Sequence, residues 1–318
     1  MTNQVALRVT GGLLLGCGGG STVSVVMVTY NRLDYLRECI RMILCQTWSD
    51  LELIVADDHS TDGTEAYVRH LAEQDPRVRY HKAHVKGGVC GAINGAIQVA
   101  RGDYIQICHD HDGYLPQFIE RLVDVMRRNP NVVFTHPGRQ GCDHLMNPLP
   151  ECHFVCGYPE ISAGRLWLKK MLLRLASPVT ALSMIRKTAL DKVGLFDPGF
   201  GASCDVDLWM RLCAVGDVGY VNELLLYVRG REPDHPYGGV NWRIFDETIR
   251  IHRKHLKLFY HGPAYFYWRL RREWEIDLSL AVSYLNSFRR RRNGDIEQGR
   301  KYLRRHGILV SRLAAWVI

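Results

Sequence analysis

The first part of the chain alternates short apolar runs with stretches of helical periodicity. Val23 to Val28 is an apolar run rich in β-branched residues, and Leu51 to Ala56 and Tyr104 to Cys108 are further apolar-biased runs. Runs of this kind are typical of strands that are buried on both faces of a sheet. Helical patterns separate them, over residues 33–46, 60–74 and 87–100. This alternation predicts βαβ units around a mostly parallel sheet, and therefore an α/β fold.

Polar residues follow each of these runs directly. The first run ends on Thr29-Tyr30-Asn31-Arg32, the second on Asp57-Asp58 and the third on His109-Asp110-His111-Asp112. In open α/β sheets, ligands bind beyond the carboxyl ends of the strands. Two carboxylates around a histidine repel or compete unless a cation joins them, and carboxylate oxygens suit Mg²⁺ or Mn²⁺. We therefore expect a metal site at this edge, although an exposed turn would use the same residue types.

The remainder of the chain is less regular. Residues 136–165 are rich in Pro, Gly, Cys and His, so we expect loops there. We expect strands over 179–185 and 218–227 and helices over 188–194 and 205–214, with a helical pattern from Trp242 onward. The predicted organisation is a glycine-rich leader over 1–20, an α/β domain over 21–235 with halves at 21–115 and 116–235, and a helical extension over 236–318.

Charge divides the chain unevenly. Residues 241–318 hold 17 Lys and Arg against 7 Asp and Glu, whereas the rest of the chain carries a net charge of −2. The basic segment also contains Tyr265, Phe266, Trp268 and Trp274. This mixture favours contact with an anionic membrane surface or plain helix packing over nucleic-acid binding. We accordingly expect a cytoplasmic protein that is peripheral at the inner face of the membrane.

The ten cysteines contain no Cys-x-x-Cys pair, and reduced thiols are the expectation we prefer. A zinc site is the alternative for one cluster, made of Cys142, His144, Cys152, His153 and Cys156. Before residue 21 the chain is too glycine-rich for a good signal peptide, and a flexible leader is expected. No apolar run reaches the length of about 18 residues that a membrane-spanning helix needs.

Four segments together resemble family 2 glycosyltransferases with the GT-A fold. They are VSVVMVTYNRLDYLRECI, LELIVADDHSTDGT, GAINGAIQVARGDYIQICHDHDGYLPQF and VGLFDPGFGASCDVDLWMRL, and they occur in the order and spacing of that family over about residues 22–230. The resemblance implies a Rossmann-like sheet and an inverting transfer of a sugar from a UDP- or dTDP-sugar. It also implies Mn²⁺ or Mg²⁺ as cofactor, and a glycan or lipid-linked acceptor.

The resemblance also implies roles for particular residues. Asp57 matches the aspartate that accepts a hydrogen bond from uracil, and Asp205 matches the general base. The positions implied for nucleotide and diphosphate binding are Thr29, Tyr30, Asn31, Asp57, Asp58, Asn94 and Asp110. The positions implied for the metal are Asp110, His111 and Asp112.

The chain departs from the family pattern at several of these places. His59 replaces the usual glycine after the two aspartates, Ile93 replaces an arginine, and Cys204 replaces the glutamate before the base. The metal motif is altered, and a histidine common in the family is replaced near Arg229 and Arg231, with His235 following later. These changes leave the ligand set of the metal open.

Each role has an ordinary structural alternative. Asp57 and Asp58 could cap the following helix, and Asp205 could be a helix N-cap with Asp207 beside it. Asp207 is also a second candidate for the base. At the level of function, a nucleotidyltransferase would share the carboxylates at the strand ends, and a degenerate binding or scaffold subunit would keep the fold without the reaction.

Overall fold

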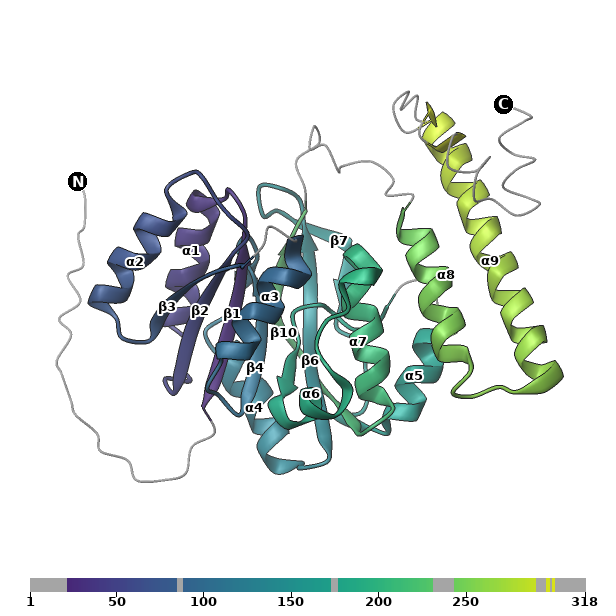
Figure 1. Ribbon diagram of the computed structural model, residues 1–318, viewed down its shortest axis with the longest axis horizontal. Helices are drawn as coiled ribbons and strands as arrows, with labels where there is room; N and C mark the ends of the chain where they lie inside the picture. Colours follow the sequence, from purple (N-terminus) through teal and green to yellow (C-terminus); the bar gives the residue numbers. More distant parts are fainter. Residues whose placement is uncertain are drawn as a thin grey trace.

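The computed structural model describes residues 22–84, 88–172, 177–230 and 243–289, together with 296, 297, 299 and 300. Within these residues ten strands form one mixed sheet, in the order β3-β2-β1-β4-β9-β6-β10-β5, with β7 on β6 and β8 on β10. The first half is parallel and comprises β1 Val23–Thr29, β2 Leu51–Asp57, β3 Val78–Lys82 and β4 Tyr104–His109. The α/β prediction is confirmed, and Figure 1 shows the sheet at the centre of the molecule.

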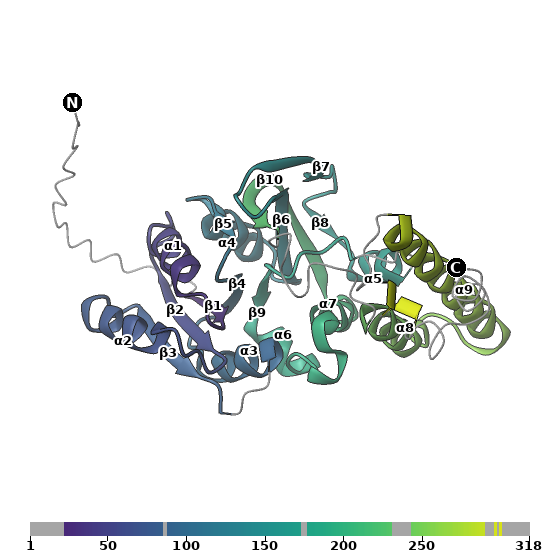
Figure 2. The same cartoon turned by 90° about the horizontal axis from the view of Figure 1, so that it is seen from above.

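Helices cover both faces of this sheet, because alternate strand residues point to opposite sides. Val23, Val25 and Met27 of β1 pack beneath α1 (Leu33–Leu44) and α4 (Phe118–Arg128). Val26 and Val28 pack beneath the helices of the other face, which Figure 2 shows on the opposite side of the sheet. These are α3 Gly88–Val99, α6 Lys187–Val193 and α7 Cys204–Cys213. The remaining early helix, α2 (Thr64–Gln74), follows β2.

The prediction of loops over residues 136–165 was wrong for much of that segment. β6 runs from Val132–Cys142 and pairs in parallel with β10 (Asp217–Arg229), and β7 (Pro148–Phe154) pairs antiparallel with β6. The glycines that suggested a loop are sites of close approach instead. A Cβ on Gly138 would lie 2.6 Å from the Glu223 carbonyl oxygen, and one on Gly141 would lie 2.6 Å from Cys152 Cβ.

Other expectations for the second half hold with altered bounds. The strand expected over 179–185 is only the short β9 (Met184–Arg186), antiparallel to both β4 and β6. α6, α7 and β10 form where helices and a strand were predicted. Short elements complete this half: β5 Gly113–Tyr114, β8 Ile161–Ser162, α5 Gly164–Leu172 and the 3₁₀ helix η1 Pro198–Ser203.

Two helices of the basic segment lie at one end of the molecule. α8 (Arg243–Leu256) packs on η1 and α7, and α9 (Gly262–Arg289) lies along α8 on its outer side (Figure 1). Ile251 and Leu256 of α8 are buried in the same core as α7. No helix in the part of the chain that the structure describes has the length and apolar character to cross a membrane. The predicted leader and His235 lie outside the described residues.

Candidate functional site

The carboxyl ends of β1, β2 and β4 lie next to one another at one edge of the sheet. In the parallel register Thr29 pairs with Asp57, and Val28 pairs with both Ala56 and His109. The polar residues that follow these strands are therefore gathered in one place, as the sequence predicted. Asp57, Asp58, Asp110 and Asp112 are all buried there.

Two histidines and two carboxylates form the centre of this edge. His109 Nδ1 lies 3.1 Å from Asp112 Oδ2, and His111 Nδ1 lies 2.8 Å from Asp110 Oδ1. The two imidazole rings stack with their centroids 5.4 Å apart. The segment after β4 is thus a compact charged cluster, and its aspartates are buried, which excludes the exposed-turn alternative.

The charges in the cluster stabilise one another. Burial raises the pKa of Asp110, but His111 and Arg32 outweigh it and hold the pKa below its usual value. Burial also raises the pKa of Asp112, and His109 and His111 outweigh that effect in the same way. Burial lowers the pKa of His109, but the two carboxylates raise it further, so the net shift is upward. The cluster therefore favours ionised carboxylates, the form in which Asp110 and Asp112 can bind a metal.

The same cluster has the donor set of a divalent metal site. Ligand atoms of His109, His111 and Asp112 all lie within 4.8 Å of one another, which no other group of three such residues does in the described part of the chain. Asp110 Oδ2 is buried without a hydrogen-bond partner. Imidazole nitrogens with carboxylate oxygens suit Mn²⁺. The residues fit the predicted metal, with His109 as an additional candidate ligand that the sequence did not single out.

The alternative zinc cluster does not form a comparable group. His153 Nδ1 instead lies 2.9 Å from Gln140 Oε1, in the β6–β7 pair. The thiols of Cys142, Cys152 and Cys156 are free. Cys142, Cys152 and His153 lie in the paired strands β6 and β7, and His144 and Cys156 lie outside them, so the five residues are not gathered around one point.

Two arginines border the cluster, and neither was a predicted site residue. Arg32 Nη1 lies 3.3 Å from Asp110 Oδ1 and 3.1 Å from His111 Nδ1. Arg229, at the end of β10, donates its backbone N–H to Asp112 Oδ1 at 2.8 Å and its Nε–H to the His111 carbonyl at 2.8 Å. Arg229 brings together segments more than a hundred residues apart, so only its position at a strand end could have suggested it.

The turn after β2 is closed by its own side chains. Asp57 Oδ1 accepts hydrogen bonds from the backbone N–H and the hydroxyl of Ser60, and Asp57 Oδ2 accepts one from the Tyr80 hydroxyl at 2.6 Å. Asp58 Oδ2 accepts one from the N–H of Gly88, at the start of α3. Neither aspartate caps α2, whose N-cap is Gly63.

The loop after β1 is tied to this turn. The backbone N–H of Asn31 donates a hydrogen bond to Ser60 Oγ at 2.9 Å. The side-chain oxygen of Asn31 accepts a hydrogen bond from the Thr61 N–H at 2.7 Å. Tyr30 is 44% exposed. His59 has φ = 67°, a left-handed conformation that glycine adopts more easily, so the backbone keeps a glycine-like turn despite the substitution.

Asn94 lies in α3 and contacts the loop that leads to α7. Its side-chain amide donates to the Phe196 carbonyl at 2.8 Å and accepts from the Phe196 N–H at 3.0 Å. Both polar groups of this side chain are therefore engaged with the backbone. Ile93, beside it, is buried in the core. The nucleotide role of Asn94 stays a prediction.

Asp205 lies in the first turn of α7 and is half-buried. Burial raises its pKa, and the nearby charge of His109 opposes this effect only in part. A carboxylate with a raised pKa, close enough to His109 to sense its charge, is suited to accept a proton at this edge. Ser203 rather than Asp205 occupies the N-cap position.

Asp207 is excluded as the alternative base. It is fully buried, and its carboxylate contacts Arg211 Nε at 2.8 Å, Lys254 Nζ at 2.8 Å and His255 Nε2 at 2.9 Å. These three groups hold its pKa far below the usual range, although burial alone would raise it. Asp207 thus links α7 to α8 and has no oxygen left for a substrate.

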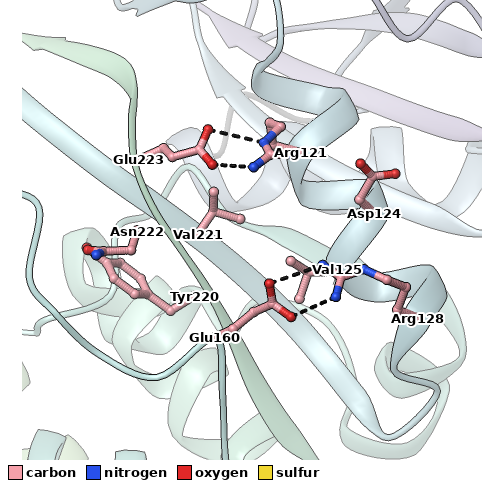
Figure 3. Close-up of a pocket in the computed structure, with 9 residues that line it drawn as sticks. All are labelled: Arg121, Asp124, Val125, Arg128, Glu160, Tyr220, Val221, Asn222 and Glu223. Atoms are coloured by element: carbon pink, nitrogen blue, oxygen red, sulfur yellow. Dashed lines mark hydrogen bonds and ion pairs between the residues drawn. The ribbon is translucent and has the colours of Figure 1, made fainter.

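A hollow of about 180 Å³ between α4 and β10 lies apart from these residues. Figure 3 shows it flanked by two ion pairs, Arg121 with Glu223 and Arg128 with Glu160. All four side chains are exposed and their charges are paired within the protein. Among the described residues, Asp124 is the one other charged residue that lines the hollow, so most of the charge around it is already neutralised within the protein.

The fold and the charged edge define a GT-A type α/β protein, and comparisons with known proteins agree. The model of glycosyl transferase family 2 matches residues 24–194, and the chain belongs to this family. An uncharacterized glycosyltransferase of Rickettsia typhi is 28% identical over 208 residues, which cover 65% of this chain and 63% of that protein. The resemblance to this family is confirmed, and the chain spans less than two thirds of the length of that relative.

Two solved structures share the fold. TarS residues 1–349 of Staphylococcus aureus, in complex with UDP-GlcNAc, align with a TM-score of 0.56 at 17% identity, covering 74% of this chain and 66% of that one. The mannosyltransferase PcManGT of Pyrobaculum calidifontis, in complex with GDP-Man and Mn²⁺, aligns with a TM-score of 0.54 at 17% identity, covering 93% of this chain and 79% of that one.

Proposed function

We propose that the protein transfers a sugar from a nucleoside-diphosphate sugar to a hydroxyl group of a glycan or lipid-linked acceptor, with inversion at the anomeric carbon. The observation that carries the proposal is the pairing of two chemistries at one edge of the sheet. Asp205, whose pKa is raised, lies within electrostatic reach of His109 in the cluster of His109, Asp110, His111 and Asp112. Asp205 is suited to accept a proton, and the cluster is suited to hold a metal.

The acceptor hydroxyl is a weak nucleophile until it loses its proton in the transition state. In this proposal Asp205 accepts that proton as general base. Its position in the first turn of α7 is fixed from α8, because Glu247 Oε2 accepts hydrogen bonds from the Ser203 hydroxyl at 2.9 Å and from the Ser203 N–H. One base without a second nucleophilic carboxylate gives a single displacement, and therefore inversion.

The leaving nucleoside diphosphate gains charge as the glycosidic bond breaks. A bound Mn²⁺ or Mg²⁺ would neutralise that charge. His109, His111 and Asp112 would hold the metal, and Asp110 Oδ2 is a further candidate ligand. Arg32 and Arg229 orient this set through Asp110 and Asp112. Thr29, Tyr30, Asn31 and the Asp57–Asp58 turn form the adjoining edge, where the nucleoside would lie.

The fold neighbours bind UDP-GlcNAc in one case and GDP-Man with Mn²⁺ in the other, which supports a nucleotide-sugar donor. We favour UDP or dTDP, because the carboxylate of Asp57, in the turn after β2, could accept a hydrogen bond from the ring N–H of uracil or thymine. A nucleotidyltransferase is the rival enzyme, and it would release pyrophosphate instead of a nucleoside diphosphate. A scaffold subunit would release neither product.

Calorimetric titration of UDP tests the proposal, with Mn²⁺ present and then with EDTA, followed by dTDP and GDP. Asp110→Asn and Asp112→Asn each keep the shape of the side chain but remove a charge from the cluster. We expect metal-dependent binding that weakens at least about tenfold in either variant, the loss of one charged interaction. Asp75→Asn is the matched control, since Asp75 pairs with Arg77 after α2.

The outcomes separate the alternatives. Binding that is indifferent to metal and to both substitutions would contradict the metal site. Failure to bind any of the three nucleotides would favour the scaffold subunit. Once a bound nucleotide is identified, the released product distinguishes the two enzyme classes. A glycosyltransferase releases a nucleoside diphosphate, and a nucleotidyltransferase releases pyrophosphate.

We also propose that α9 contacts an anionic membrane surface. Its exposed face carries a stripe of apolar side chains spaced mainly four residues apart: Phe266, Leu270, Trp274, Leu278, Val282 and Leu285. Trp268 and Tyr265, which the sequence also suggested, instead pack inward, with Trp268 stacked on Tyr260. The peripheral placement at the inner face of the membrane stays a prediction.

The arginines described in this helix contribute less than their number suggests. Arg269 pairs with Glu273, and Arg271 and Arg272 pair with Glu275. Arg253 of α8 also contacts Glu273. Insertion of the apolar stripe, rather than net charge alone, would therefore provide most of the binding free energy.

A further inference from the structure

A second hollow, of about 220 Å³, lies on the sheet beside β6 and β10. Four of the nine described residues that line it are aromatic and none is acidic: His136, Pro137, Arg139, Phe154, Cys156, Tyr158, Ser177, Pro178 and Tyr220. We call these nine residues the β6 pocket. Flat aromatic faces at the wall of a pocket are suited to pack against the C–H faces of a sugar ring.

Arg139 is the only strongly basic side chain in the β6 pocket. Its guanidinium lies over the Phe154 ring, with Cζ 4.5 Å from the ring centroid. Among the residues that the structure describes, no carboxylate or carbonyl accepts a hydrogen bond from it. Burial lowers the pKa of Arg139 from its usual value. A half-buried cation without an anion is costly, and an incoming anionic group would remove that cost.

His136 provides an independent observation in the same pocket. It is 1% exposed, and among the described residues neither of its ring nitrogens has a hydrogen-bond partner. Burial and the nearby Arg139 charge lower its pKa to about 3, so the ring is neutral at physiological pH. A neutral imidazole has one N–H to donate, and a buried donor without a partner is uncommon in folded proteins.

The β6 pocket has one wall residue in common with a cavity at the start of α7. Ser177 lines both the β6 pocket and a small cavity that Ser203 and Val206 also line. Ser203 and Val206 are the neighbours of the Cys204–Asp205 pair in the chain. Ser177 therefore separates the β6 pocket from the segment of α7 that carries Asp205.

We infer that the β6 pocket binds an anionic group of the acceptor saccharide, a carboxylate or a phosphate, through Arg139 and the His136 imidazole. The identification of this saccharide as the acceptor rests on the proposed function, whereas the binding of an anionic saccharide does not. Tyr158, Tyr220 and Phe154 would pack against the sugar that carries the group. The protein would then prefer acidic glycans to neutral ones.

Direct binding to the full chain tests this inference without donor or metal. Three disaccharides of the same linkage serve as probes, ending in glucuronate, in glucose 6-phosphate and in glucose. Ligand-observed NMR gives their dissociation constants at low salt. We expect at least one acidic probe to bind about tenfold more tightly than the neutral one, as expected for a charge-assisted hydrogen bond.

Variants assign the preference to the β6 pocket. Arg139→Gln should abolish the preference for the acidic probe, whereas Arg139→Lys should retain part of it. His136→Phe should weaken the binding of the acidic probe but keep the wall intact. Arg165→Gln is the matched control, because Arg165 also lies over an aromatic ring, that of Phe259, but outside the β6 pocket. Circular dichroism checks that each variant is folded.

The probes also distinguish the two sources of charge. Preference for glucuronate alone indicates an acceptor that bears a uronic acid, and preference for the phosphate alone indicates a phosphorylated acceptor. Equal binding of all three probes to the natural protein would overturn the inference, as would an acidic preference that Arg139→Gln leaves unchanged. A separate titration of UDP with Mn²⁺ measures nucleotide binding on its own. A failure of the proposed donor site can therefore be distinguished from a failure of saccharide binding in the β6 pocket.

Discussion

At the scale of single residues, two aspartates on one turn of α7 have opposite pKa shifts. Asp205 is half-buried, and burial raises its pKa, whereas Asp207 is fully buried and its hydrogen bonds to His255, Lys254 and Arg211 lower its pKa. The sequence places them two positions apart and does not distinguish them. Their environments do, because a helix turns through about 200° in two residues and directs the side chains to different neighbours.

Asp205→Asn should lower the rate of sugar transfer by about 100- to 10,000-fold, the usual contribution of a general base. Nucleotide binding and thermal stability should change little. Because burial raises the pKa of Asp205, transfer by the natural protein should fall as the pH falls through that raised pKa, above the usual aspartate value. A pH–rate profile of initial velocities checks this, and a normal rate in the variant would exclude Asp205 as base.

Asp207→Ala should instead affect folding. Removing one partner of a buried ion-pair network costs about 3–5 kcal/mol, because Arg211, Lys254 and His255 lose their shared anion. The free energy of unfolding in urea measures this cost. The folded-state pKa is lowered, so the stabilisation is present above the usual aspartate pKa and is lost as the pH falls below it. The variant should not show that loss at acid pH.

At the scale of elements, the pairing of β6 with β7 and β10 depends on residues that break strands elsewhere. Pro137, Gly138 and Gly141 all lie within β6. Composition favours a loop there, but neighbouring segments of the same chain approach Gly138 and Gly141 so closely that a side chain at either position would collide with them. A single sequence carries no sign of that approach, because the partner atoms come from residues more than ten positions away.

Gly141→Ala should therefore destabilise the protein by about 1–3 kcal/mol, the usual cost of overpacking. The added Cβ would lie 2.6 Å from Cys152 Cβ, and β7 would have to move. Gly157→Ala is the matched control, since its added Cβ meets nothing within 4 Å, and its effect should stay within about 0.5 kcal/mol. Thermal denaturation of both variants tests the comparison, and equal melting temperatures would contradict it.

At the scale of the whole molecule, α8 joins the α/β body to α9. Asp207 and Ser203 of the body contact His255 and Glu247 of α8, and α8 supports α9 on its outer side. The helix α8 is thus packed onto the half of the body that contains α7, and α9 is packed onto α8. If α9 lies on a membrane, α8 fixes the distance between that surface and Asp205.

Replacing both Phe266 and Trp274 by Ser should weaken flotation with phosphatidylglycerol vesicles by at least about tenfold, because each removes a large apolar side chain from the stripe. Leu145→Ser is the control, since Leu145 is 68% exposed in the connection between β6 and β7. Undiminished flotation of the double variant would locate membrane contact elsewhere. No flotation of the natural protein would remove the membrane proposal.

The sequence by itself determined the parallel half of the sheet and the gathering of its polar ends. Those features depend on local periodicity and on the rule that ligands lie beyond parallel strand ends, so residues 23–29, 51–57 and 104–112 were sufficient. Only the tertiary structure decided the rest. His109 joined the metal candidates, Asp207 was separated from Asp205, and Arg139 has no anionic partner in the described part of the chain, because contacts between distant segments set burial and charge.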